Sequence, residues 1–511
     1  MHSLLFLCAR RLVSRSPGSR RALRVLPAEL YPVLFRAAFL DGRPLALRDL
    51  VATWPFPVLN LRRLLGQPGQ HRGGHRSPQP LLPERSSKLC IQAIILAVVA
   101  HLRRELEEPC GGTSKSRCHL RVMDLTDLQD DDAERGPEGM SLWSGTVALA
   151  KACLEVSKYQ SEFLKRSSKR RKGPSGTSAA PQPLGVEIRA DLFVNGTSFG
   201  ILRDALQTAG PLRLKCRDFH AEELSVAGTV SLLESLEPAG VRRVELRFNN
   251  LGLSGLCAVF PHLARFPDLL SLKLPYSNVD VRRLMSGMDP GFRSLAAQLG
   301  ILPNLKELNL GSSWLSGQLR QLLGDLRTPL ESLELPFCSL LPGDFAFLSQ
   351  SLHAAALRKL DLSGHNFSDH LLQPLQHLLE ETSPSLLHLD LMECRLTDTR
   401  LEVLLPSLCR CSHLRCLGLF GNFFSTPGLW TLVRKTAVLL DLRLVVYPYP
   451  TDCYVPELPR AVGLLAEDAL DEERFAAVSA ELSRMLVSSG RADAVWTTSL
   501  CRHSALDCFS L

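Results

Sequence analysis

Three short stretches of this sequence hold residue types that can bind phosphate, metal or lipid. "GGTSKS" (111–116) is like a phosphate-binding loop, but Ser114 stands where that motif has the glycine before its lysine, and no strand pattern precedes it. "HRGGH" (71–75) offers two imidazoles without a convincing third ligand. The final "CFSL" has the outline of a prenylation box, but Ser510 stands where an aliphatic residue is expected. None of the three predicts a working site.

The sequence also lacks the motifs of common catalytic classes. It contains no GxSxG elbow, no HExxH pair, no GxGxxG loop and no paired CxxC. We therefore predict no catalytic residue, no metal and no cofactor. The protein is expected to act by binding other molecules rather than as an enzyme.

Composition narrows the class of partner. The 511 residues are 45% hydrophobic and 22% charged, which is typical of a folded chain. Much of the net charge of +7 lies in the first residues and in "KRSSKRRK" (165–172), which argues against a nucleic-acid-binding face spread over the whole protein, and we expect no nucleic-acid partner. The longest apolar run, 89–102, is shorter than the roughly 20 residues that cross a bilayer, so it predicts a buried helix and no membrane partner. The 15 irregularly spaced cysteines predict reduced thiols in a cytoplasmic protein that can also be nuclear.

The second half of the sequence repeats itself. Apolar residues at positions zero, three and five recur at steps of mostly 25 to 29 residues, a spacing that is typical of long leucine-rich repeats. The eight units begin at Val241, Leu269, Leu305, Leu330, Leu357, Leu386, Leu414 and Leu439. Each unit predicts a short strand followed by a helix that returns along the outside. The fold class is therefore α/β: a leucine-rich-repeat solenoid, or horseshoe, with a parallel inner sheet, outer helices, a helical N-terminal head and a helical C-terminal cap.

The repeats assign structural places to residues that otherwise suggest chemistry. Eight positions after each start, a small polar side chain is expected to bond the backbone of the turn. Asn249, Cys338, Cys394 and Asn422 occupy that place, with Ser277 and Ser313 as weaker versions and His365 as a departure. Cys409, Cys411 and Cys416 are spaced like metal ligands, but they fall on a helix and a strand, so packing is the favoured interpretation.

The residues between the strand leucines predict a mixed, charged inner face that binds a client protein. A solvated face without a partner is the alternative. The client-binding candidates are Arg243, Glu245, Lys306, Glu334, Lys359, Asp361, His388 and Asp390.

Five segments divide the chain. They are a helical head (1–64), a loop with a buried helix (65–118), irregular N-terminal repeats interrupted by a basic loop at 165–184 (119–240), regular repeats (241–450) and a C-terminal cap (451–511). The basic loop is favoured as a solvated linker, with a nuclear-import or phosphorylation site as the alternative.

Several stretches together resemble the PRAME family over nearly the whole chain, and within it the subfamily of leucine-rich repeat-containing protein 14. They include "LVATWPFP", "LRVMDLTDL", "VRRVELRFNNLGLSGL", "CRDFHAEEL", "LESLELPFC" and "SGRADAVWTT". The resemblance implies a substrate-recognition subunit of a ubiquitin ligase built on cullin-2, elongin B and elongin C. It also implies restraint of Toll-like-receptor and NF-κB signalling through an IκB kinase subunit.

The family's elongin-binding box is matched by Ser3, Leu4, Cys8 and Leu12, and its cullin box by Leu26, Pro27, Leu30 and Leu34. On a helix, residues four apart share a face, as an anchor helix in an apolar groove requires. Two rival roles stay open for the protein. One is a stoichiometric scaffold or inhibitor without ubiquitin transfer, and the second is a mitochondrial protein whose acid-free leader before Glu29 is a transit peptide.

Overall fold

The computed structural model describes residues 4–14, 23, 25–65, 87–107, 118–127, 141–170, 185–280, 290–454 and 470–499. The stretches at 71–75, 111–116 and 508–511 and the elongin-box residue Ser3 lie outside the described residues. The chain divides into two compact units, Met1–Glu222 with Ser231–Val241, and Glu223–Val230 with Arg242–Leu511. Each is described by itself.

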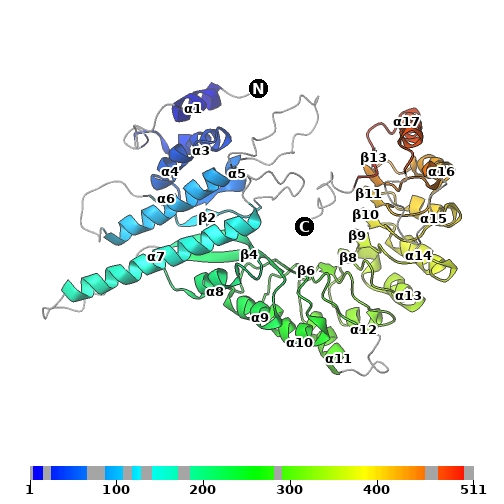
Figure 1. The fold of residues 1–511 in the computed structure, drawn as a ribbon, viewed down its shortest axis with the longest axis horizontal. Helices are drawn as coiled ribbons and strands as arrows, with labels where there is room; N and C mark the ends of the chain where they lie inside the picture. Colours follow the sequence, from blue (N-terminus) through cyan, green and yellow to red (C-terminus); the bar gives the residue numbers. More distant parts are fainter. Residues whose placement is uncertain are drawn as a thin grey trace. The chain divides into compact units, whose positions relative to one another are not determined.

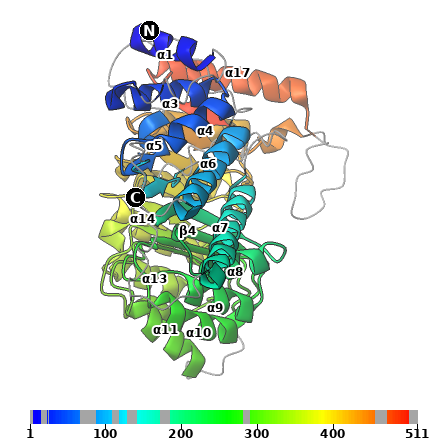
Figure 2. The same cartoon turned by 90° about the vertical axis from the view of Figure 1, so that its left-hand side faces the viewer.

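The first unit begins with helices and continues with longer strands. Its elements are α1 (Leu4–Ser14), a 3-10 turn (Ala28–Leu30), α3 (Tyr31–Leu40), α4 (Pro44–Ala52), β1 (Val58–Asn60), α5 (Leu61–Leu65), α6 (Ser87–Glu107), β2 (Val122–Asp124), α7 (Leu142–Arg170), β3 (Val186–Val194), α8 (Phe199–Gln207) and β4 (Leu212–Glu222). The strands β1 to β4 pair in parallel and in chain order. Figure 2 shows α6 and α7 side by side, and the two helices are in contact.

Aromatic rings form the core of the head. Trp54 is fully buried, and its ring meets those of Tyr31, Phe35 and Phe56 edge-on at 5.7 to 6.1 Å between centroids. Its indole Nε1 donates to the carbonyl oxygen of Val58 at 3.1 Å, so the polar edge of the ring is satisfied inside the core. This bond joins the end of α4 to the first strand.

The second unit alternates short strands with helices. Its elements are β5 (Arg243–Arg247), α10 (Gly252–Leu263), β6 (Ser271–Lys273), α11 (Pro290–Gly300), β7 (Glu307–Asn309), α12 (Leu319–Leu323), β8 (Ser332–Glu334), α13 (Pro342–Gln350), β9 (Lys359–Asp361), α14 (Asp369–Thr382), β10 (His388–Asp390), α15 (Asp398–Arg410), β11 (Cys416–Gly418), α16 (Thr426–Thr436), β12 (Leu444–Val446), α17 (Glu472–Ser488) and β13 (Val495–Thr497). The helix α9 (Val226–Ser235) crosses the boundary between the units.

The strands of the second unit also pair in parallel and in chain order, from β5 to β13. Within this unit, Figure 1 shows the strands β6 to β13 on the inner side of the curve and the helices α10 to α16 on the outer side. The leucines at the centre of the strands β6 to β11, such as Leu308 and Leu333, are fully buried between sheet and helices. The predicted repeat solenoid with inner strands and outer helices is confirmed.

The last repeat begins three residues later than its sequence pattern predicts. In the strand register, Leu444 of β12 pairs with Cys416 of β11, so the unit starts at Leu442 and not at Leu439. "LLDLRL" and "LRLVVY" both place apolar residues at zero, three and five, and valine and tyrosine replace leucine in the second. Counted in this frame, the last unit begins at Leu442, 28 residues after Leu414, the start of the preceding unit.

Several elements confirm or correct the expectations from sequence. The buried helix predicted at 89–102 and the helical cap are present, as α6 and α17. The head, expected to be helical, contains β1, and the cap contains β13. Residues 165–170 belong to α7 rather than to a loop, because the helical pattern runs on into the basic sequence.

The predicted turn positions are structural. Asn249, Ser277, Ser313, Cys338, His365, Cys394 and Asn422 are all buried. The amide of Asn422 donates to the carbonyls of Leu391 and Leu419 at 2.8 Å, and its oxygen accepts from the backbone of Cys394 and Leu396. The thiol of Cys338 reaches the carbonyl of Leu310 at 3.3 Å, and burial raises its pKa to about 12. We call these seven residues the turn ladder, and Asn422 and Cys338 tie their own turns to the preceding repeat.

Candidate protein-binding surfaces

Two rows of side chains cross the inner face of the second unit, one on each side of the central strand leucine. The pairing register aligns Arg243, Ser271, Glu307, Ser332, Lys359, His388, Cys416 and Leu444 in the first inner row. It aligns Glu245, Lys273, Asn309, Glu334, Asp361, Asp390, Gly418 and Val446 in the second inner row. Neighbouring members are one strand spacing apart, about 4.8 Å.

Carboxylates gather on three adjacent strands of the second inner row. Glu334, Asp361 and Asp390 follow one another on β8, β9 and β10. Lys359 lies among them, with its Nζ 3.3 Å from Glu334 Oε1. Burial, and next the charge of Asp390, raise the pKa of Asp361 to about 6. The pKa of Lys359 is raised because Glu334 and Asp390 outweigh the effect of burial, which lowers it. Lys273 on β6 also pairs with Glu334, at 3.8 Å. Three acids with these two lysines leave this part of the face with a small excess of negative charge.

One carboxylate oxygen of Asp390 has a hydrogen-bond partner, and the other has none among the described residues. Its Oδ2 lies 2.8 Å from Nε2 of His388, whereas no hydrogen-bond donor among the described residues reaches its Oδ1. A Cβ added to Gly418 would clash with that oxygen, so the carboxylate leans over the glycine of the next strand. The buried Oδ1 therefore offers an acceptor to a ligand at the inner face.

The inner face changes character toward its C-terminal strands. Cys416, Leu444 and Val446 form a buried apolar cluster, with Met392 and Phe420 packed against it. The surface therefore offers acidic groups over β8 to β10 and apolar groups over β10 to β12. The leucine periodicity reveals the strands, but it does not show which residues between the leucines cluster.

The rows contain seven of the eight client-binding candidates. Arg243, Glu245, Glu334, Lys359, Asp361, His388 and Asp390 all lie in the two inner rows. Lys306 does not, because it precedes β7 and alternation directs it away from the face on which Glu307 lies. Its Nζ pairs with Glu331 at 2.7 Å. Lys273 and Asn309, which were not among the candidates, lie in the second inner row.

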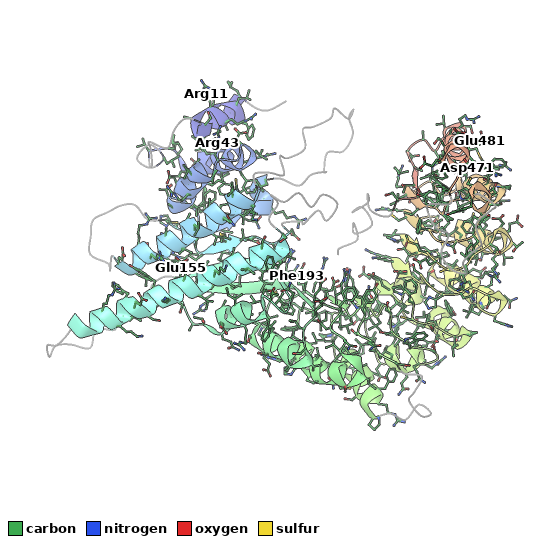
Figure 3. All side chains as sticks on the ribbon, in the orientation of Figure 1. Arg11, Arg43, Glu155, Phe193, Asp471 and Glu481 are labelled. Atoms are coloured by element: carbon green, nitrogen blue, oxygen red, sulfur yellow. The ribbon has the colours of Figure 1, made fainter. Side chains whose placement is uncertain are left out.

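A second surface lies on α1 in the head. Phe6 and Ala9 are buried, and the guanidinium of Arg36 lies 5.9 Å from the centre of the Phe6 ring. Arg10 pairs with Asp41 at 2.8 Å, which further holds α1 against the head. Leu4 is 78% exposed, and Leu7, Cys8 and Leu12 are exposed as well. Arg11, labelled in Figure 3, also lies on the exposed part of α1.

The cullin-box candidates lie in the next turns of the head. Leu26 and Leu30 are half-buried and Pro27 is exposed, directly before and within the 3-10 turn. Leu34 lies in α3 and is only 3% exposed, so it belongs to the head core. Of the three leucines predicted to share a face, Leu26 and Leu30 are therefore partly exposed to solvent, whereas Leu34 packs inside the head and supports α3.

The cysteines show no sign of a metal centre in the part of the chain that the structure describes. Cys409 lies on α15 with its thiol 3.4 Å from the carbonyl of Lys435, whereas Cys411 is buried and Cys416 belongs to the first inner row. Across the described ranges, no three or more His, Cys, Asp or Glu side chains come together as a metal ion requires. The described cysteines are thiols and not disulfides. Among the described helices, none combines the length and apolar character that a bilayer crossing needs.

Strands in parallel succession, a side-chain ladder at each turn and an open inner face define a leucine-rich-repeat protein, a class that commonly binds other proteins on that face. The chain belongs to the PRAME family, because residues 2–71 match the PRAME N-terminal domain and residues 203–510 match the PRAME C-terminal domain.

Relatives place the chain in a subfamily. It is 52% identical to leucine-rich repeat-containing protein 14 of Xenopus laevis and 45% identical to that of Homo sapiens, over all of both chains in each case. It is 29% identical to PRAME family member 12 of Homo sapiens over 91% of this chain and 86% of the relative.

Among solved structures, a TLR13–ssRNA13 complex matches 53% of this chain and 42% of its own, with 18% identity and a TM-score of 0.32. LegL7 of Legionella pneumophila matches 52% of this chain and 75% of its own, with 18% identity and a TM-score of 0.29. These TM-scores are too low to support an inference about shape or function.

Proposed function

We propose that this protein is a non-catalytic adaptor that recruits a client protein to a cullin-2 ubiquitin ligase. The head would bind elongin C through α1, elongin B would join through elongin C, and the inner rows would bind the client. The proposal extends the family membership of the chain, and family resemblance further favours a client in NF-κB and Toll-like-receptor signalling, such as an IκB kinase subunit.

The observation that carries the proposal is the division of α1 into two apolar faces. Phe6 and Ala9 already attach the helix to the head, so Leu4, Cys8 and Leu12 are not needed for that contact. An apolar stripe at a spacing of four residues on a short exposed helix is what a helix-binding groove recognises. Burying three such side chains contributes roughly 1.5–3 kcal/mol for each large one.

Replacement of Leu4 and Cys8 by aspartate tests the elongin contact. We expect the double variant to fold as the parent does and to lose elongin C in co-purification, because two charges in an apolar groove leave buried groups unpaired. A matched control is Leu96→Asp on α6, which changes an exposed leucine of the same unit. Retention of elongin C by the double variant would refute the assignment.

The cullin contact can be tested separately through Leu26. Leu26→Asp changes a half-buried residue outside the packed core of the head. We expect it to reduce co-purification of cullin-2 while elongin C is retained. Equal loss of both partners would show that the two boxes do not act separately.

A stoichiometric scaffold remains the second candidate, since the inner rows bind a client in either case. The two roles differ in what the Leu4 and Cys8 variant does to the client. If the protein is an adaptor, this variant would still bind the client but would no longer lower the client's abundance. If the protein is a scaffold, the variant would keep its full effect on the client. Client half-life in cells that carry either form distinguishes them.

A further inference from the structure

Three aromatic residues lie in an unusual backbone conformation on the second unit. Phe248, Tyr276 and Phe337 each precede a ladder residue and have φ of 54°, 57° and 57°. Their side chains are 47%, 47% and 45% exposed. We call these three residues the aromatic edge. They lie where the chain turns out of β5, β6 and β8, at the carboxyl ends of the strands.

The equivalent positions in neighbouring repeats show what this backbone conformation requires. Gly364 and Gly421 occupy it with φ of 75° and 72°, and Ser312 occupies it with φ of 60°. A bulky residue is strained in the left-handed region, whereas glycine is not. The fold therefore does not need an aromatic residue at this position.

Ring packing offsets only part of this strain and does not hide the rings. Phe248 and Tyr276 stack with centroids 4.4 Å apart and planes 18° apart, a favourable arrangement of two aromatic rings. Phe337 leans over Gly364, where an added Cβ would clash with the ring. Three residues carry the strain but only two of them share a stack, and Ser312 occupies the turn between Tyr276 and Phe337. Folding stability therefore does not explain these three half-exposed rings.

On the strands β8 to β10, beside Phe337, carboxylates outnumber lysines. Glu334, Asp361 and Asp390 follow one another in the second inner row, and Lys359 is the lysine on these strands. Each inner-row residue lies three positions before the edge position of its own strand, which is roughly 10 Å along the chain. Two cations close to the edge in sequence are already paired, Arg247 with Glu245 at 3.0 Å and Lys273 with Glu334 at 3.8 Å. An arginine-bearing partner would meet aromatic faces and carboxylates together.

We propose that the aromatic edge and the acidic part of the second inner row bind an extended, arginine-rich segment of the client. This proposal rests on the proposed role of the inner rows as the client surface. Guanidinium planes stack on aromatic faces and form forked hydrogen bonds with carboxylates, so one type of side chain can engage both parts of the site. Asp390 Oδ1, which has no donor within the described residues, provides one acceptor for such a fork.

The test measures binding of a fluorescein-labelled arginine–glycine repeat peptide to the full chain by fluorescence anisotropy. The first variant replaces Phe248, Tyr276 and Phe337 by serine, the residue that Ser312 shows to be compatible with this backbone. The second combines Glu334→Gln with Asp361→Asn. We expect each to weaken binding at least about tenfold, because the first removes the aromatic faces on which guanidinium groups stack and the second removes two carboxylates that accept from them.

A matched control replaces three exposed apolar residues elsewhere on the second unit, Val438, Leu440 and Val487, by serine. It should bind the peptide as the parent does. Unchanged affinity in the aromatic variant would overturn the proposal. So would tighter binding of a glutamate–glycine repeat peptide or of oligothymidylate by the unaltered protein, because an acidic partner or a nucleic acid would then be favoured.

Elongin C co-purification separates this proposal from the adaptor role. The aromatic variant should retain elongin C, because its changes lie outside the head. If the unaltered protein binds the arginine peptide but not elongin C, the adaptor role fails and the peptide site stands. If it binds elongin C but the aromatic variant still binds the peptide normally, the peptide site fails and the adaptor role stands.

Discussion

At the scale of single residues, the turn ladder shows that residues at equivalent positions can contribute differently to folding stability. Asn422 makes hydrogen bonds with four backbone groups while fully buried. Ser313 occupies the same position in an earlier repeat, and its buried Oγ has no partner among the described residues. The same position in the repeat therefore holds Asn422, which bonds four backbone groups, in one unit and Ser313, whose hydroxyl has no partner among the described residues, in another.

We expect Asn422→Ala to lower the free energy of unfolding by about 3 kcal/mol or more, because it leaves several buried backbone groups without partners. Ser313→Ala should be neutral or slightly stabilising, because it removes a buried hydroxyl that bonds nothing among the described residues. Chemical denaturation of the two variants measures the difference. A large loss in Ser313→Ala would mean that its hydroxyl has a partner in solution.

Asp361 supplies a second residue-scale prediction, because its raised pKa couples folding to pH. A carboxyl whose pKa is about 6 in the folded state and about 3.9 when unfolded makes the protein less stable as pH rises from 4 to 6. Asp361→Asn removes that charge and keeps an oxygen that can accept from the backbone of Ser363. The variant should be more stable than the parent above pH 6, by about 2–3 kcal/mol, and equal to it near pH 4.

Thermal melts of Asp361→Asn at about pH 7.5 and about pH 4 test this expectation. Asp325→Asn, a change at an exposed aspartate of the same unit, should alter the melting temperature at neither pH. A variant that is less stable than the parent at the higher pH would mean that the attraction of Lys359 for Asp361 outweighs the repulsion from Asp390.

At the scale of elements, the C-terminal end depends on one buried arginine. Arg491 follows α17, whose N-cap Asp471 is labelled in Figure 3. Its guanidinium donates to the carbonyls of Leu439 and Leu442, which precede β12, and lies 3.4 Å from Asp493. The arginine thus ties the turn after the last helix to the start of the next inner strand.

We expect Arg491→Met to lower the free energy of unfolding by about 2–4 kcal/mol, because two buried carbonyls lose their donors while the apolar stem is kept. Hydrogen exchange should increase most at residues 439–446. Arg484→Met is the control, since Arg484 on α17 is exposed and its pairing with Glu481 contributes little. Equal effects of the two changes would contradict the structural role of Arg491.

Sequence reasoning succeeded for elements whose apolar spacing is strict. The strands from β5 to β11 follow from their leucines, and the cap helix follows from its own periodicity. It failed where two frames satisfy one pattern, as at Leu439 and Leu442, and where a strand is short and flanked by proline, as at Val58. Lys306 shows a third cause, because only pairing register decides which neighbour of a strand leucine reaches the inner face. The exposed positive-φ aromatics have no simple spacing signal.

At the scale of the whole molecule, repeats that contact mainly their neighbours should tolerate removal of a complete unit. Deleting residues 386–413 joins Ser385 to Leu414 and brings β11 beside β9 in the same register. We expect a folded protein with a cooperative but lower melting transition. Deleting only residues 386–399 removes half a unit and should unfold the C-terminal repeats, as circular dichroism and limited proteolysis would show.

The parallel, chain-ordered pairing of the strands from β5 to β13 has a mechanical consequence. When tension is applied at the C-terminal end, strands that pair in chain order detach one after another. Only the hydrogen bonds between the last two strands then break at each step. Each unit of about 28 residues would release roughly 95 Å of extended chain. A pull applied to the last repeat would therefore detach terminal repeats and leave the remaining repeats folded.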